Sequence, residues 1–203
     1  MPVTQLHTYF NSFIKEKKLL PFSINRCFFL IILLSISLFL PNKALAQTDE
    51  HTLKAVLLER FTRFIEWEKQ SESNYFNIVV IGSNEKMTLK LRKVYKNHKI
   101  QDKNVKVIQI RHLNELKNHS CDILYVSENM SKELEEITAY TYSKSILTIA
   151  DTKNFARRGV VINFYIKNDS VQFKINTDAA KKANLQISYH LLKIADIVTE
   201  LEP

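Results

Sequence analysis

The chain has 203 residues, of which 45% are hydrophobic and 25% are charged, and its formal net charge at pH 7 is +8. It contains only two glycines, Gly82 and Gly159, although average glycine usage is about 7%. Glycine-rich turns that hold phosphate groups or expose a nucleophile need several glycines close together. The composition therefore excludes a Walker loop, a GxGxxG turn and a GxSxG elbow.

The first 46 residues have the pattern of a secretory signal peptide. The apolar run FFLIILLSISLFL at positions 28–40 follows a basic segment and precedes the small residues of Ala44-Leu45-Ala46. The run is shorter than the ~20 apolar residues of a membrane span, although an uncleaved N-terminal anchor is the alternative. We expect residues 1–46 to be a cleaved signal peptide and residues 47–203 to form one exported domain.

Cleavage after Ala46 would change both the charge and the cysteine content. It would remove five of the 29 basic residues and one of the 21 acidic residues, leaving a net charge of +4. So modest a charge on an exported domain argues against nucleic-acid binding. Cys121 would be the only cysteine left, so no intramolecular disulfide could form. We expect Cys121 to be buried, because it begins the apolar run CDILYV; an exposed thiol in an intermolecular disulfide is the alternative.

Helical and strand patterns alternate along the first part of the domain. Apolar residues at helical spacing predict an amphipathic helix over 51–67, on which Glu59 and Arg63 can form an ion pair. Ser131 is the predicted N-cap of a helix with acidic residues in its first turns. The other predicted elements are a strand ending at Gly82, a helix over 87–95, a strand over 105–110, a short helix over 113–116, and strands over 123–126 and 146–150.

The last third of the chain breaks this alternation. Strand patterns over 160–166 and 171–175 are separated by a hairpin-length gap that contains Asn168-Asp169, and a last helix is predicted over 178–201. Alternating strands and helices favour a parallel sheet. The predicted fold class is therefore α/β, with a central, largely parallel sheet flanked by helices, closing with an antiparallel hairpin and a C-terminal helix.

No group of residues predicts catalysis, a metal or another cofactor. The histidines lack HxxxH and HExxH spacing, and His119 close to Cys121 is a weak metal signal. Cys121 with a histidine is the only candidate nucleophile pair, and its apolar neighbours favour burial instead. Ser127 and Asp151 follow strands, where α/β folds bind ligands. Asp151 is also placed to cap a helix, which we favour.

Three stretches of the chain resemble the YfiR-like family of secreted bacterial proteins. They are LKAVLLERFTRFIEW, HSCDILYVSEN, and a closing segment that runs from Leu147-Thr148 to Ala195. The resemblance implies a soluble periplasmic α/β protein, often a dimer, that binds the periplasmic part of an inner-membrane diguanylate cyclase and holds it inactive. Relief of that repression would raise cyclic-di-GMP and favour biofilm. Members that sense redox use intramolecular disulfides, which a single mature cysteine cannot form.

Most shared positions of the closing segment are expected to be structural. Gly159 is expected to allow an unusual backbone conformation, and Asn163 and Asn176 to satisfy backbone polar groups. The expected core residues are Phe155, Ile162, Phe164, Phe173, Ile175 and Leu191.

The sequence therefore predicts a non-catalytic regulatory binding protein without a cofactor, whose partner is an inner-membrane signalling protein. One alternative is a periplasmic small-molecule-binding module that uses the strand ends near Ser127 and Asp151, and another is a hydrolase that uses Cys121. Arginine and tryptophan are enriched where binding energy concentrates. The predicted contact residues are Arg60, Arg63, Trp67, Asp151, Arg157 and Arg158.

Overall fold

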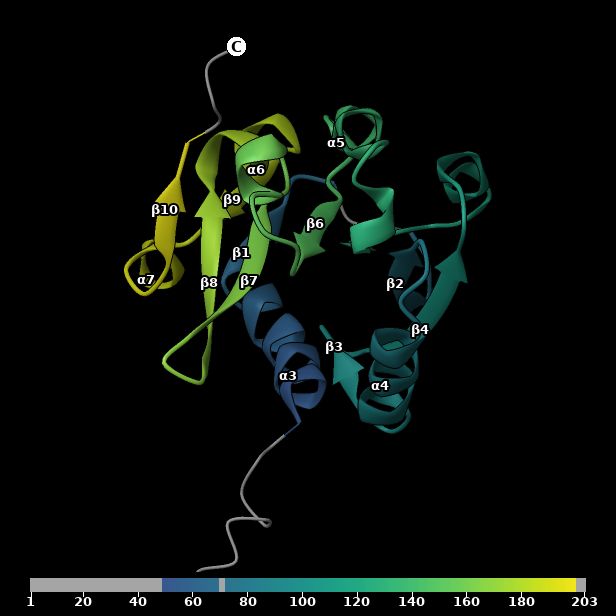
Figure 1. The fold of residues 1–203 in the computed structure, drawn as a ribbon. Helices are drawn as coiled ribbons and strands as arrows, with labels where there is room; N and C mark the ends of the chain where they lie inside the picture. Colours follow the sequence, from purple (N-terminus) through teal and green to yellow (C-terminus); the bar gives the residue numbers. More distant parts are fainter. Residues whose placement is uncertain (1–48, 70–71, 200–203) are drawn as a thin grey trace, which may run out of the picture. The chain divides into compact units, whose positions relative to one another are not determined.

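The structure, a computed structural model, describes residues 49–69 and 72–199 (Figure 1). Within them the main sheet has eight strands, with β7–β8 and β3–β4 antiparallel and the other neighbours parallel. Across the sheet, the strands are β10 (Asp196–Val198), β8 (Ser170–Asn176), β7 (Ile162–Lys167), β6 (Leu147–Ala150), β5 (Ile123–Val126), β2 (Tyr75–Ile81), β4 (Lys103–Ile110) and β3 (Lys99–Ile100). This confirms the predicted α/β class with a largely parallel sheet. The predicted signal peptide lies outside the described residues.

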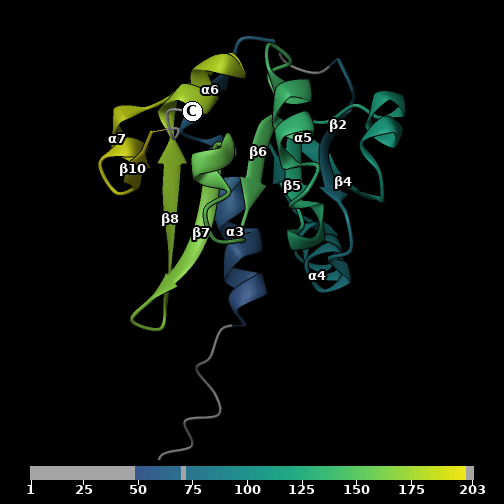
Figure 2. The same cartoon turned by 45° about the horizontal axis from the view of Figure 1, so that its top comes forward.

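Helices cover both faces of this sheet. The α-helices are α3 (Glu50–Thr62), α4 (Glu85–Tyr95), α5 (Leu134–Thr141), α6 (Thr177–Lys182) and α7 (Tyr189–Leu192). Short 3-10 segments are η3 (Leu113–Asn118), η4 (Glu128–Met130) and η5 (Ala156–Arg158). Two buried clusters of apolar side chains lie between helices and sheet: α3, α4 and α6 pack on one face, and η3, η4 and α5 on the other. Figure 2 shows helices arranged around the strands of the sheet.

The central strand β2 shows why the sequence forms this layered core. Its side chains alternate between the two faces, as in any strand. Ile78 and Val80 belong to the cluster under α3 and α4, and Val79 and Ile81 belong to the cluster under α5. Because both faces are covered, the strand reads as a continuous apolar run rather than an alternating one.

The predicted hairpin joins β7 to β8. Asn168 and Asp169 form its turn with φ of 50° and 56°. Two consecutive residues with positive φ are typical of the tight turn that matches the twist of antiparallel strands, and asparagine and aspartate tolerate this conformation well.

The first predicted helix is too long at its C-terminus. α3 ends at Thr62, and Ile65–Trp67 forms β1, which pairs antiparallel with β9 (Leu185–Ile187). The backbone of Phe64 also accepts a hydrogen bond from the Ser188 amide at 2.9 Å. Pairing with a distant segment therefore decides the conformation here, and local helical spacing does not.

The predicted C-terminal helix over 178–201 is wrong. The chain forms α6, then β9, α7 and β10, within the described residues that end at 199. Asn184 has a left-handed backbone with φ of 56°, a conformation that commonly ends helices. Its amide donates to the carbonyl of Lys181 at 3.0 Å, which closes the last turn of α6.

Ser131 is not the N-cap of the next helix. α5 begins at Leu134, and Glu133 occupies its N-cap position. The Ser131 hydroxyl instead accepts a hydrogen bond from Nη1 of Arg158 at 3.0 Å.

Candidate functional site

The carboxyl ends of several parallel strands meet at one edge of the main sheet. From β2 the sheet extends to β4 on one side and to β5, β6 and β7 on the other, so the strand order reverses direction beside β2. Open α/β sheets bind ligands at this edge, near such a reversal. Ser127 follows β5 and Asp151 follows β6, so both predicted strand-end residues lie at this edge.

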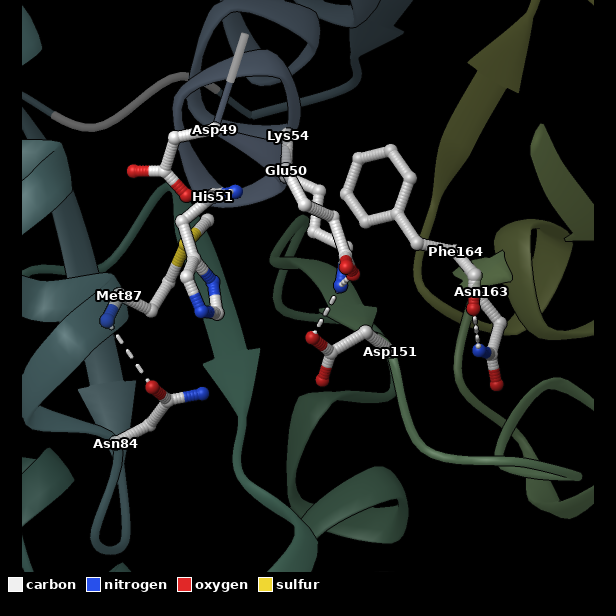
Figure 3. A network of polar contacts seen from close by, with 9 residues as sticks. All are labelled: Asp49, Glu50, His51, Lys54, Asn84, Met87, Asp151, Asn163 and Phe164. Atoms are coloured by element: carbon white, nitrogen blue, oxygen red, sulfur yellow. Dashed lines mark hydrogen bonds and ion pairs between the residues drawn. The ribbon is translucent and has the colours of Figure 1, made fainter. Parts of the chain in front are cut away.

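A buried lysine joins α3 to this edge. Lys54 is 3% exposed, and its Nζ lies 2.6 Å from Oδ2 of Asp151 and 2.5 Å from Oε1 of Glu50 (Figure 3). An ammonium group removed from water is costly unless charged partners replace its hydration. The two carboxylates do so. These three residues, which we call the Lys54 cluster, therefore fasten the first turns of α3 to the end of β6.

Asp151 is consequently not the helix cap that the sequence favoured. No α-helix begins after it, since residues 152–155 form a turn, and its carboxylate accepts from Lys54. Burial, followed by the charge of Asp151, raises the pKa of Tyr125 on the neighbouring strand β5. That hydroxyl therefore stays protonated at neutral pH.

The sequence analysis did not predict a role for Lys54, although its position in the helical pattern indicates burial. It stands four residues before Leu58 and seven before Phe61, which are both buried in the core. This spacing places all three on one face of a helix. A lysine inside an apolar stripe predicts a buried carboxylate partner.

A second set of polar contacts fixes the starts of α3 and α4. Asp49 caps α3 by accepting from the His51 amide at 3.2 Å, and its other oxygen lies 2.5 Å from Nζ of Lys90 on α4. The hydrogen bond from Lys90 lowers the pKa of Asp49. Asn84 caps α4 by accepting from the Met87 amide at 3.0 Å (Figure 3). The cap of α3 therefore also links the two helices.

A pocket of 370 Å³ lies beside the Lys54 cluster, between the loop after β6 and the hairpin of β7 and β8. We call it the Asp151 pocket. Lys153, Arg157 and Lys174 contribute three cations to its lining, and Asp151 contributes a carboxylate that Lys54 already neutralises. This excess of positive charge favours an anionic group.

Two buried asparagines bind the backbone of Ala156, which lines this pocket, and so satisfy backbone polar groups as the sequence predicted. The amide of Ala156 donates to Oδ1 of Asn163 at 2.9 Å, and its carbonyl accepts from Nδ2 of Asn176 at 2.7 Å. Asn163 also donates to the carbonyl of Phe164 at 2.8 Å (Figure 3). Gly159 ends the same loop with φ of 94°, a left-handed conformation that favours glycine. This part of the lining is thus held by side chains that water does not reach.

The predicted contact residues on the first helix separate from one another. Arg60 lies on α3 and Arg63 is its C-cap, and both are exposed. Nε of Arg63 donates to Glu59 at 2.7 Å, which confirms the predicted ion pair. Trp67 does not end the helix but belongs to β1. Its ring packs edge-to-face against Phe76, with centroids 6.2 Å apart.

The predicted contact residues of the second segment also face different ways. Asp151 and Arg157 both line the Asp151 pocket. Arg158 instead holds the start of α5: its Nε donates to Oε1 of Glu135 at 2.8 Å, and its Nη2 donates to the carbonyl of Ser131 at 2.5 Å. The hydrogen bond from Arg158 lowers the pKa of Glu135.

Cys121 is poorly suited to be a nucleophile. Its thiol donates to the carbonyl of Ile123, with sulfur and oxygen 3.2 Å apart, and burial raises its pKa well above the usual value. The thiolate is the reactive form, so this environment suppresses reactivity. Within 49–69 and 72–199, no three His, Cys, Asp or Glu side chains are grouped so that they could hold a metal.

The fold and this site define a class of protein: an α/β domain with a largely parallel sheet and a basic pocket at its carboxyl edge. The chain belongs to the YfiR/HmsC-like family, whose sequence model matches residues 51–196. Membership supports a periplasmic regulatory role, and interaction with a membrane signalling partner, in general terms. The described residues contain no helix that is long and apolar enough to cross a membrane. No curated protein sequence matches the chain.

Solved structures share the fold at low sequence identity. One is described as the ABC domain in complex with L-Trp from Streptococcus pneumonia, with a TM-score of 0.50 and 11% identity over 73% of this chain. Another is a conserved domain protein from Vibrio cholerae O1 biovar eltor, with a TM-score of 0.51 and 12% identity over 74% of this chain. The matches span 60% of the length of each of those chains. At such identity, the likeness concerns the fold alone.

Proposed function

We propose that the protein is a non-catalytic periplasmic regulator that binds the periplasmic part of an inner-membrane diguanylate cyclase and holds it inactive. The observation that carries this proposal is the match to the YfiR/HmsC-like family over residues 51–196. Two features of the site agree with it. Lys54 and Asp151 already neutralise each other, and the pKa of Cys121 is raised by burial, so neither supplies an activated catalytic group.

The proposed contact surface centres on exposed arginines. Arg60 and Arg157 are exposed, and the side chain of Arg63 is 69% exposed. Arginine is enriched among the residues that dominate binding energy. Trp67 and Arg158 are engaged in contacts within the protein. Replacing either of them would therefore act through the fold as well as through a partner.

Deletion of the gene tests the proposed function directly. Loss of the protein should raise cyclic-di-GMP and surface attachment. Complementation with Arg60→Glu/Arg63→Glu should fail to lower them, because the reversed charges oppose the partner. A matched control is Lys132→Glu/Lys167→Glu, which makes the same change in net charge at exposed positions elsewhere and should restore repression. Unchanged cyclic-di-GMP in the deletion strain, across envelope stresses, would contradict the repressor role.

A second candidate function is small-molecule binding in the Asp151 pocket. It is favoured by the position of this pocket at the carboxyl edge, by its three cations, and by a lining already fixed by Asn163 and Asn176. A chain of similar fold was solved in complex with L-Trp. A thermal-shift screen of periplasmic metabolites, L-Trp included, should find a stabilising compound whose effect is lost in Arg157→Ala. Absence of stabilisation by every compound would count against this candidate.

A further inference from the structure

A cleft of 590 Å³ lies between α3 and α4, apart from the Asp151 pocket. Small-molecule sites in proteins typically have volumes of about 300–1,000 Å³, so this cleft has room for a small organic molecule. Val56 of α3 and Val94 and Tyr95 of α4 contribute apolar surface to it. We call it the α3–α4 cleft.

Tyr95 holds the two helices at a fixed spacing. It is 4% exposed, and its hydroxyl donates to the carbonyl of Ala55 at 2.6 Å and accepts from the amide of Glu59 at 3.1 Å. These two backbone groups stand four residues apart, so a regular helix would pair them with each other. The Tyr95 side chain of α4 thereby bridges two backbone groups within one turn of α3. Hydrogen bonds within the protein therefore fix the position of Tyr95, which lines the cleft.

The charges around the α3–α4 cleft are strongly unbalanced. Arg63, Lys90, Lys93 and Lys99 line it, and Glu59 is the only carboxylate among its lining residues. Arg63 is paired with Glu59, and Lys90 is paired with Asp49.

Lys93 and Lys99 have no ion pair within 49–69 and 72–199. Lys90, Lys93 and Val94 are three and four residues apart, so they share one face of α4. Cations therefore stand beside apolar surface, and an anion bound among them would reduce their mutual repulsion.

We propose that the α3–α4 cleft binds a small organic anion, in which a carboxylate, sulfonate or phosphate group is attached to an apolar body. The anionic group lies between Lys93 and Lys99, and the apolar body lies on Val56 and Val94. Tyr95 is already fixed in position, which reduces the entropic cost of binding. This proposal does not rest on the proposed function, because it concerns a cleft that needs no partner protein.

The test uses 8-anilinonaphthalene-1-sulfonate, whose sulfonate and aromatic rings represent the two chemical parts of the proposed ligand. Protein purified after export is titrated by fluorescence and by amide NMR. We expect one site, with the largest shifts at Val56, Val94 and His98. Inorganic phosphate, an anion without an apolar body, should not displace the probe at equal concentration. Absence of binding, or equal competition by phosphate, overturns the proposal.

Charge reversal locates the site. Lys93→Glu/Lys99→Glu should raise the Kd of the probe about tenfold, since two attractive contacts become repulsive. The control Lys132→Glu/Lys167→Glu changes the net charge equally and should alter the Kd by less than about twofold, because distant exposed charges are screened. Equal weakening in both variants would mean that only overall charge matters. Shifts centred on the exposed residues Tyr189 and Ile194, or on the Asp151 pocket, would place the probe elsewhere and refute the inference.

Discussion

Replacing Lys54 with methionine should destabilise the protein by about 2–3 kcal/mol. Methionine keeps the apolar packing but removes the ammonium, which leaves Asp151 without its charged partner. Breaking a fully buried pair costs about 3–5 kcal/mol. The side chain of Asp151 is 20% exposed and that of Glu50 is 47% exposed, so water offsets part of the loss. For a domain of this size, the expected loss corresponds to a decrease in Tm of about 4–12 °C.

Urea unfolding of Lys54→Met, Asp151→Asn and the double variant measures this interaction as a double-mutant cycle. We expect the double variant to lose less than the sum of the single variants, with a coupling of at least ~1 kcal/mol. Glu50→Gln is the control, because the carboxylate at the exposed end of the cluster should contribute under ~1 kcal/mol. Additive losses, or a Lys54→Met protein as stable as the wild type, would refute the account of the Lys54 cluster.

Four further outcomes follow from the same structure. Asn176→Ala should cost about 2–4 kcal/mol in urea unfolding, because the side chain satisfies two buried backbone groups; a loss under ~1 kcal/mol would contradict this. Gly159→Ala should cost about 1–2 kcal/mol, since φ is 94° and the new methyl would lie 3.2 Å from Thr138. Burial raises the pKa of Asp122 above its ordinary 3.8, so ionisation is disfavoured in the folded state and stability falls as pH rises through that raised pKa. Asp122→Asn should therefore gain most over the wild type at neutral pH and lose this gain below pH 3.8, and a gain independent of pH would count against it. Cys121 should react with iodoacetamide far more slowly in the native than in the urea-unfolded protein, as followed by mass spectrometry; equal rates would show an accessible thiol.

The parts of the fold that the sequence predicted correctly are those that local pattern determines. β5 lies at the predicted positions 123–126, because a short apolar run buried on both faces leaves little choice of boundary. The turn at Asn168-Asp169 was recognisable because both residues tolerate positive φ. Asn163 and Asn176 were correctly expected to bind backbone groups, although their shared partner Ala156 was not foreseeable.

The remaining elements depend on contacts between distant parts of the chain. Trp67 reads as a helix end, but Leu185 pairs with it and makes β1 a strand. The partners Lys54 and Asp151 are separated by 97 positions, so no local spacing connects them. The α3–α4 cleft likewise arises only when two helices pack. In the sequence, the lysines and arginines of each helix look like ordinary exposed residues. Only the packing of the two helices brings them to the same cleft.

The pairing of β1 with β9 also bears on when the chain can fold. Ile65 pairs with Ile187, and Ile197 then pairs with Ile175 at the sheet edge. β1 therefore cannot pair until residues 185–187 of β9 are present. Such pairing between distant segments is intrinsically slow to form. A chain that ended before Leu185 would leave the backbone of β1 without its partner strand.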